Sequence, residues 1–492
     1  METNGLKKRI VSMLLSLSVL VSFSGCSNGG GDTTTTEDTS SADVETTTEE
    51  TTSDAEEVTT TVEDVEVKLE SHVDEIEDIS ATDLTYDMQV GWNLGNSLDA
   101  YSNKEGNETA WGNPEVNLDL IKAVADAGFK CVRIPVTYMG QCGDAPDYTI
   151  NEDWLNRVQE VVDMVTGCGM YAIINIHHDG NNDTNGGAWL DITQPDQTEI
   201  QERFKKMWEQ ISTKFADYDE YLVFESMNEI HDGTYQEPTG DTAQTYYDNI
   251  NALNQIFVDT VRASGGNNEL RCLLVPGWNT SIDYTVNGFN DGATTFDLPE
   301  DTATDKLMVS VHYYDPYDYC LKEALYVTGW GLGADRSAKW GNEDYVNQQF
   351  QLLEDTFVSQ GVPVIIGEFG AVKKVDEDSR RYYLEYVTKS AKEHGLLPVY
   401  WDNGWDGDYG FSLFDRTTGE QQHPDLIEAI VRAGKDQDYE IALPAGYDAT
   451  ALEALTDTNG SSDSSSDSDT NSEDTTEDTS EDGGETETDD VA

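Results

Sequence analysis

Eight short apolar runs recur at wide spacing along the middle of the chain. They begin at Val90, Cys131, Tyr171, Tyr221, Cys272, Leu307, Pro363 and Leu396. Most of them are apolar at nearly every position rather than at every second one, which is typical of parallel strands covered on both faces. The pattern therefore predicts eight buried strands within one folded region.

Helical periods lie between several of these runs. The segment "EDWLNRVQEVVDMVTGCG" carries an apolar stripe made of Leu155, Val158, Val161, Val162 and Val165. Gly167 is predicted to end this helix, and Gly128 ends a similar pattern in "LDLIKAVADAGFK". Strands that alternate with helices predict an α/β fold, a (β/α)8 TIM barrel, with an open doubly wound sheet as the alternative. No Gly-rich phosphate loop follows the first run, which disfavours a nucleotide-binding sheet.

The first 26 residues predict a lipoprotein-type signal peptide. A basic cluster, Lys7 to Arg9, precedes the apolar run Ile10 to Phe23, which is too short to span a membrane comfortably. Gly25 then stands before Cys26, the residue expected to be lipidated, although Phe23 departs from the usual leucine. We expect a bacterial protein exported to the cell surface and attached to the membrane only by this anchor. Ordinary signal cleavage, with release to the medium, and an uncleaved anchor are the alternatives.

Two polar tracts flank the folded region. Residues 27–75 form a Thr/Ser/Asp/Glu-rich segment, and residues 456–492 form an acidic tail. Such tracts bury too little apolar surface to offset chain entropy, so both are predicted to be disordered. Residues 80–440 are predicted to form a single catalytic domain.

The charge of the chain restricts its partners. The 492 residues include 28 Lys and Arg against 97 Asp and Glu, a net charge of −69. Nucleic acid and anionic membrane surfaces would repel such a protein. The six cysteines show no spacing typical of a disulfide framework or a zinc site, and buried free thiols are expected.

Polar and aromatic residues collect where the predicted strands end, the edge at which barrel enzymes carry their chemistry. They are Trp92, Asn93, Arg133, His177, His178, Asn228, Glu229, Trp278, His312, Tyr314, Glu368, Trp401 and Asp402. One polar residue ending a strand is commonly a loop exit or a helix cap. Two glutamates with an arginine, several histidines and aromatics at one edge instead favour a catalytic site.

Glu229 ends the fourth strand and Glu368 the seventh. Across a barrel mouth their carboxyl groups are expected to approach to about 5–5.5 Å, as retaining glycosidases require. Arg133 would favour ionised Glu368, and Tyr314 would donate a hydrogen bond to the same carboxylate. The Asn228 amide is placed to bind a sugar 2-hydroxyl.

Aromatic residues near the same edge are candidates for stacking on sugar faces. They are Trp92, Trp278, Trp401, Trp405, Tyr313 and Tyr317, and packing in the core is the alternative for each. A further acid, Glu225, lies four residues before Glu229 and faces inward on the same strand. Buried there, it needs a partner, for which Arg133 is the first candidate.

The motifs "GWNLGNSLDA", "VRIPVTY", "INIHHD", "FESMNEI", "SVHYYDPY", "GEFGA" and "YWDNG", in this order, resemble glycoside hydrolase family 5. The opening "GWNLGNSLDA…WGNP" is most similar to its bacterial endoglucanase branch, subfamily 4. The resemblance implies a retaining endo-β-1,4-glucanase in which Glu229 is the acid/base and Glu368 the nucleophile. It also assigns to the catalytic set Arg133, His177, Asn228, His312 and Tyr314, with Trp401 at the substrate.

Four further residues are implied at the sugar subsites: Asn96, His178, Trp92 and Asp402. The "HH" pair leaves a choice for the catalytic histidine, and His177 is favoured. No cofactor is implied, and a monomer acting on a β-glucan polysaccharide is expected. Xyloglucan, mixed-linkage glucan, xylan and mannan remain alternative substrates. The loop 315–345, with Trp330 and Trp340, either walls the cleft or packs on the barrel.

Two other classes of protein, a metallohydrolase and a binding module, are disfavoured by the sequence. A metallohydrolase would need clustered ligands, but adjacent strand residues such as His177 and His178 point to opposite faces, and no H-x-H or H-E-x-x-H motif occurs. A binding module would hold glycan in the aromatic cleft without cleaving it. The presence of both carboxylates disfavours that class.

Overall fold

A computed structural model describes residue 69 and residues 72–450, except 181–186, 234–237, 290–291, 324–325 and 448–449. The fold belongs to the unit Met1–Asp448, and of the second unit, Ala449–Ala492, only Thr450 is described. The predicted signal peptide with Cys26, nearly all of the predicted linker and the acidic tail lie outside the described residues. The predictions for them stay predictions.

The eight predicted strands are all present and close into a parallel barrel, in which β1 pairs with both β4 and β10. This confirms the predicted TIM barrel and rules out the open sheet. The strands are β1 (Gly91–Leu94), β4 (Cys131–Ile134), β5 (Tyr171–Asn175), β6 (Leu222–Glu225), β7 (Leu273–Pro276), β8 (Leu307–Tyr313), β9 (Val364–Phe369) and β10 (Leu397–Asp402). A separate hairpin, β2 (Tyr101–Ser102) with β3 (Glu105–Gly106), follows β1.

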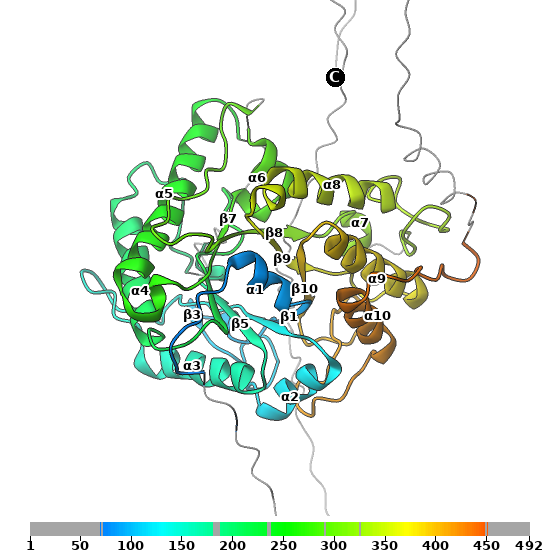
Figure 1. Cartoon of the computed structure of the whole chain (residues 1–492), viewed down its shortest axis with the longest axis horizontal. Coiled ribbons are helices and arrows are strands. Elements are labelled where there is room, and N and C mark those ends of the chain that lie inside the picture. The colour runs from blue at the N-terminus through cyan, green and yellow to red at the C-terminus, as the bar shows by residue number, and fades with distance from the viewer. Residues whose placement is uncertain are drawn as a thin grey trace, which may run out of the picture. The chain divides into compact units, whose positions relative to one another are not determined.

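Helices surround the strands (Figure 1). They are α2 (Leu118–Ala127), α3 (Glu152–Gly167), α4 (Thr198–Lys214), α5 (Asp241–Ala263), α6 (Ile282–Asn287), α8 (Glu343–Thr356), α9 (Glu377–Glu393) and α10 (Pro424–Lys435). Two further helices are α1 (Ala81–Asp87) and α7 (Tyr317–Cys320). Short 3-10 turns are η1 (His178–Gly180), η2 (Gly266–Glu269), η3 (Trp278–Thr280) and η5 (Val358–Gln360).

Both helix ends predicted at glycines are confirmed. Gly128 ends α2 with φ of +106°, a left-handed conformation that glycine adopts without steric cost. Gly167 is the last residue of α3, and Cys168 is its C-cap. The left-handed residue that follows is Gly169, at φ +74°. The second glycine of "GCG" therefore turns the chain after the helix has ended at the first.

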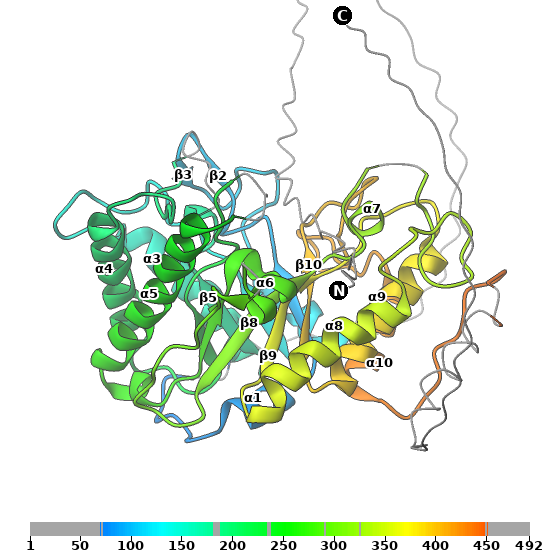
Figure 2. The same cartoon turned by 90° about the horizontal axis from the view of Figure 1, so that it is seen from above.

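Helix α1 closes the end of the barrel at which the strands begin. Its residues Ala81, Leu84 and Met88 are buried in one apolar cluster with inward side chains of the strands, among them Cys131, Ile173, Val223, Leu274, Met308, Ile365 and Leu397. Figure 2 shows α1 at one end, and the β2–β3 hairpin and α7 at the opposite end. The strand ends that carry the predicted catalytic residues therefore lie at the end of the barrel opposite α1, on the side of the β2–β3 hairpin and α7.

The five cysteines in the described part of the chain are unpaired. Cys131, Cys272 and Cys320 are buried, as the sequence predicted, whereas Cys142 and Cys168 are only half-buried. Among the described residues, no helix is both long enough and apolar enough to cross a membrane.

A buried arginine ties together the loops at the strand beginnings. Arg271, just before β7, is fully buried, and its Nε donates to Asn268 Oδ1 at 2.7 Å. Its Nη atoms donate to four backbone carbonyls, those of Phe215, Tyr218, Asp219 and Leu222. Since a buried cation without partners would be strongly unfavourable, this set of acceptors fixes the turn that leads into β6.

We predict that Arg271→Met lowers the free energy of unfolding by about 3 kcal/mol, because four buried carbonyls lose a charged donor. The matched control is Lys205→Gln on α4, where Lys205 Nζ lies 3.9 Å from Glu209 on an exposed surface. That substitution should change the free energy of unfolding by less than about 1 kcal/mol. Urea denaturation measures both, and equal effects of the two substitutions would contradict the prediction.

Candidate active site

Arg133 forms hydrogen bonds that connect the side chains of the site. It lies on β4, fully buried, and its Nη1 donates to Glu368 Oε1 at 2.9 Å and to Asn93 Oδ1 at 3.0 Å. Nη2 donates to Asn228 Oδ1 at 2.8 Å, and Nε donates to Glu225 Oε2 at 2.7 Å. One guanidinium therefore orients four side chains from three strand ends.

The Arg133 guanidinium stays protonated and positively charged. Burial alone lowers the pKa of Arg133, but the carboxylates of Glu225 and Glu368 outweigh burial and raise that pKa above its usual value. Arg133 thus acts as a fixed positive charge beside Glu368. The predicted partner of Glu225 is confirmed as Arg133.

Glu368, on β9, is held by groups from two other strands. The Tyr314 hydroxyl donates to Glu368 Oε2 at 3.0 Å, and His312 Nδ1 lies 3.6 Å from the same oxygen. His177 Nε2 lies 4.0 Å from Oε1. Gly367 beside it leaves room for the histidine, because a Cβ there would stand 3.2 Å from His312 Nε2. The small residue in "GEF" thus lets β8 and β9 approach each other at the site.

Glu229 follows β6 and faces Glu368. His312 Nδ1 lies 2.7 Å from Glu229 Oε1. One oxygen of Glu229, one of Glu368 and one ring nitrogen of His312 all lie within 4.8 Å of one another. This matches the close carboxyl spacing of about 5–5.5 Å in retaining glycosidases rather than the 6.5–9.5 Å or so of inverting ones.

The two carboxyl groups have different surroundings. Burial raises the pKa of Glu368, while His312 and Arg133 act against that rise. Burial acts in the same direction on Glu229, but the hydrogen bond and charge of His312 outweigh it, and the pKa of Glu229 is lowered. Glu229 is also the more open of the two, with 18% of its side chain exposed against 8% for Glu368.

His177 and His178 lie together, which the sequence reasoning did not expect. Strand β5 ends at Asn175 and η1 begins at His178, so the alternation of a strand no longer applies. The two rings stand 4.5 Å apart at 82°. The sequence argument that placed them on opposite faces was therefore wrong.

Asn175 fixes the orientation of His177. Its amide nitrogen lies 3.1 Å from His177 Nδ1 and 2.9 Å from Glu225 Oε2. Because an amide nitrogen only donates, Nδ1 accepts, and the neutral ring carries its proton on Nε2, toward Glu368. Burial and nearby positive groups lower the pKa of His177 well below its usual value, so the ring is neutral. Asn175 was missed, although it interrupts the apolar run "YAIINI".

His178 lies at the edge of the site with three neighbours that sequence reasoning did not assign. Its Nε2 is 3.6 Å from Asp99 Oδ2. Its ring centroid lies 5.8 Å from that of Tyr101 and 5.3 Å from that of Trp111. Trp111 stands in the quoted "WGNP", so the motif was seen but its tryptophan was not.

Trp401, on β10, presents a half-buried ring to the same space. Its ring lies parallel to that of His177, at 4° and 6.1 Å between centroids. Gly95 allows this position, because a Cβ there would stand 2.8 Å from the indole. The predicted sugar platform at Trp401 is thus supported by its placement. Asn96, the residue after Gly95, is half-buried, and its role at a sugar subsite stays a prediction.

Trp92 and Asp402 do not fit the substrate role predicted for them. Both are fully buried, and Trp92 Nε1 donates to Asp402 Oδ2 at 3.0 Å. Arg416 pairs with Asp402 Oδ1 at 3.0 Å and stacks over the Trp92 ring. These side chains support the loop after β10 from behind and have no surface with which to contact a sugar.

The other aromatic candidates divide in the same way. Trp278 and Tyr313 are buried and pack in the core, whereas Tyr317 is half-buried and Trp405 is 60% exposed. In the loop 315–345, Trp330 is buried against α9, and its Nε1 donates to the carbonyl of Gly341 at 2.6 Å. This part of the loop packs on the barrel.

Two groups of side chains in the described ranges gather atoms of the kinds that bind metals. One is Asp99, His177 and His178, and the other is Glu229, His312 and Glu368. In the second group the hydrogen bond between His312 and Glu229 already uses the nearest atoms. We assign neither group as a metal centre, and the metal-free chemistry stays a prediction.

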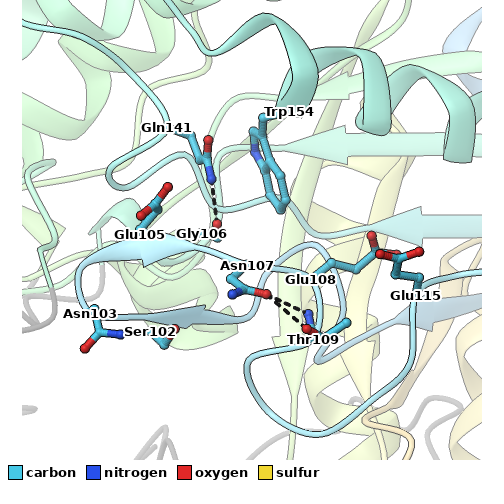
Figure 3. Close-up of a pocket in the computed structure, with 10 residues that line it drawn as sticks. All are labelled: Ser102, Asn103, Glu105, Gly106, Asn107, Glu108, Thr109, Glu115, Gln141 and Trp154. Atoms are coloured by element: carbon cyan, nitrogen blue, oxygen red, sulfur yellow. Dashed lines mark hydrogen bonds between the residues drawn. The ribbon is translucent and has the colours of Figure 1, made fainter.

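A cavity of about 390 Å³ lies away from these carboxylates (Figure 3). It is bounded by the β2–β3 hairpin, Gln141 and the Trp154 indole of α3. Gln141 Nε2 donates to the Gly106 carbonyl at 2.7 Å across its wall. None of the catalytic candidates lines it, so the cavity is not the active site.

Comparisons with known proteins agree with this geometry. A family model described as Cellulase (glycosyl hydrolase family 5) matches residues 95–407. Endoglucanase A of Paenibacillus barcinonensis is 46% identical over 367 residues, 72% of this chain and 90% of that protein. A solved family 5 xyloglucanase from Paenibacillus pabuli, in complex with ligand, is 48% identical with a TM-score of 0.68, covering 72% of this chain and all of its own. A GH5-4 broad specificity endoglucanase from Bacteroides salanitronis is 43% identical with a TM-score of 0.68, over 75% and 97% of the two chains.

We predict that Tyr314→Phe moves the acidic limb of the pH profile of kcat/KM upward by roughly half a unit to one unit. The hydroxyl donates to ionised Glu368, so its loss raises the pKa of that carboxyl, and activity is lost at a higher pH. The profile is measured on a soluble β-1,4-glucan.

Tyr313→Phe is the matched control. The Tyr313 hydroxyl is buried and has no hydrogen-bond partner among the described residues. Its removal should leave the limb in place. An unmoved or lowered limb in Tyr314→Phe would contradict the assignment of its hydrogen bond.

Proposed function

The chain belongs to glycosyl hydrolase family 5 and is an endo-β-1,4-glucanase; from that premise we propose that it cleaves internal bonds by double displacement between Glu229 and Glu368. The observation that carries this mechanism is the pair of facing carboxyl groups, with atoms within 4.8 Å. Glu368 accepts hydrogen bonds from the Arg133 guanidinium and the Tyr314 hydroxyl. Glu229 is paired with His312, and its side chain is more exposed than that of Glu368. These contacts support Glu368 as the nucleophile and Glu229 as the acid/base.

In the first step a Glu368 oxygen bonds to the anomeric carbon while the bond from that carbon to the leaving oxygen breaks. The electron pair goes to the leaving oxygen, which takes a proton from Glu229. The hydrogen-bonded pair of Glu229 and His312 holds that proton at the mouth of the site. The product is a glycosyl ester of Glu368.

In the second step water attacks the anomeric carbon and gives a proton to Glu229. The ester bond to Glu368 breaks, and the carboxylate returns to the bonds from Arg133 and Tyr314. Esterification removes the negative charge of Glu368, which lowers the proton affinity of Glu229 at the moment when it must act as a base. Two inversions at one carbon give net retention.

The remaining side chains orient the sugar. Because Arg133 occupies the Asn228 oxygen, the Asn228 amide turns its nitrogen outward, where it donates to a 2-hydroxyl. Trp401 supplies a flat face for the ring of the sugar at the cleavage point. His177 presents its Nε2 proton beside Glu368 and helps to orient that carboxylate.

The substrate is a β-1,4-glucan, and xyloglucan is the second candidate. The Paenibacillus pabuli relative is described as a xyloglucanase, and the Bacteroides salanitronis relative as a broad specificity endoglucanase. A product profile on cellulose derivatives, xyloglucan, mixed-linkage glucan, xylan and mannan decides. Activity on xylan or mannan without activity on glucans would refute the glucanase preference.

We also propose that the enzyme acts at the cell surface as a monomer, attached through lipidated Cys26. The basic cluster, the short apolar run and the Gly25–Cys26 pair support this proposal. The anchor would keep the released sugars close to the cell. A protein that is fully secreted and not associated with the membrane would refute the anchor.

We predict that Glu368→Ala and Glu229→Ala each lower turnover by several orders of magnitude, and that added azide rescues them differently. In Glu368→Ala azide replaces the nucleophile and gives a glycosyl azide of inverted configuration. In Glu229→Ala azide attacks the glycosyl ester and gives the retained product. The configuration of each azide is read by NMR.

The Gln variants of both residues serve as folding controls, because they keep shape and remove charge. Their thermal unfolding should match that of the parent enzyme. Retained azide from Glu368→Ala, or inverted azide from Glu229→Ala, would reverse the two roles.

A further inference from the structure

Glu225 is a buried carboxylate that the double displacement does not use. It lies on β6, fully buried, and receives hydrogen bonds from three other strands. Arg133 Nε donates to its Oε2 at 2.7 Å, and Asn175 Nδ2 donates to the same oxygen at 2.9 Å. The Ser310 hydroxyl donates to its Oε1 at 2.7 Å. Glu225 is therefore part of a buried hydrogen-bond network inside the barrel.

Glu225 and Glu368 bind the same cation from two sides. Arg133 gives its Nε to Glu225 and its Nη1 to Glu368, and both contacts are buried. A buried guanidinium with a single carboxylate partner would stabilise that carboxylate strongly. A nucleophile stabilised to that degree stays ionised but attacks poorly.

We propose that Glu225 is a positioning residue that shares the charge of Arg133 and so keeps the ionised Glu368 carboxylate nucleophilic. The proposal rests on the assignment of Glu368 as the nucleophile. Glu225 neither touches the sugar nor exchanges a proton during the cycle. It acts through Arg133 on the electrostatic potential at Glu368.

The same carboxylate acts on His177 through a second route. Asn175 donates from one amide nitrogen to both Glu225 and His177 Nδ1, and its Oδ1 accepts from the Val136 N–H at 3.2 Å. This fixes the amide and therefore the tautomer of His177. Glu225 thus orients two of the groups around Glu368, the guanidinium and the imidazole.

In the described part of the chain, charged or titratable groups face Glu368 from four strands or their ends. Arg133 faces it from β4, His177 from the end of β5, Glu229 from the end of β6, and His312 and Tyr314 from β8 and its end. Glu225 adds a negative charge one contact further away. Its removal leaves the positive charge of Arg133 directed at Glu368 alone.

Glu225→Gln removes the charge without removing the hydrogen bonds. The Gln oxygen still accepts from Arg133 and Asn175, and its amide nitrogen donates to the Ser310 oxygen, whose proton turns away. We expect the acidic limb of the kcat/KM profile to move downward by roughly one pH unit, because a nearby negative charge is gone. Formation of the glycosyl ester should slow by up to about tenfold, while its hydrolysis is not slowed, since Glu368 leaves more readily.

The second variant, Ser310→Ala, should move the acidic limb of the kcat/KM profile upward. It keeps the Glu225 charge but removes a donor that partly neutralises it, so the acidic limb should rise by a few tenths of a unit or so. Glu343→Gln is the matched control: Glu343 is a buried carboxyl on α8, bound by Tyr382 and the Leu332 N–H. It lies outside the active site, and its loss should leave the limb in place.

Thermal unfolding and pH profiles of the three variants, with single-turnover kinetics on an aryl glycoside, test the proposal. A folded Glu225→Gln enzyme whose limb is unmoved or raised overturns it, even if turnover falls. If that variant does not fold, a limb in Ser310→Ala that is unmoved or lowered overturns it. The azide products of Glu368→Ala report separately on the nucleophile, so charge sharing and the proposed mechanism fail independently.

Discussion

The buried charge of Arg133 is the constraint on which the site depends. A guanidinium in a barrel interior is tolerated only when its donors are matched, and here acceptors come from Asn93, Glu225, Asn228 and Glu368. Each acceptor is thereby fixed in direction. One cation therefore holds Glu368, the Asn228 amide and the strand ends that carry them. Glu368 is placed precisely because it is part of this buried network, and Glu229 faces it through its contact with His312.

The apolar runs were sufficient to predict the fold. Parallel strands buried on both faces leave nearly continuous apolar sequence, and each such run became a strand of the barrel. The same regularity located the strand ends, and with them Arg133, Glu229, His312, Tyr314 and Glu368. Even the inward direction of Glu225 and its pairing with Arg133 followed from side-chain alternation, because that part of β6 keeps regular strand geometry.

Where strand geometry stops, the sequence reasoning failed or was silent. His177 and His178 meet because β5 has already ended at Asn175, and no local pattern marks that residue as the last. Trp92 and Asp402 are 310 residues apart in sequence, so their mutual hydrogen bond left no trace in any window of residues. Asp99, Tyr101 and Trp111 reach His178 from a loop whose path only the folded chain determines. Local periodicity indicates which face of an element a residue occupies. It does not indicate which distant residue forms a hydrogen bond with it.

The central claim is that Glu368, held by Arg133 and Tyr314, forms a covalent bond to the sugar. The most direct measurement is peptide mass mapping after reaction with a 2-deoxy-2-fluoro glucoside bearing a good leaving group, which slows hydrolysis of the ester. The account predicts one added sugar on the peptide that contains Glu368. A label on Glu229, or complete turnover with no covalent adduct, would contradict it.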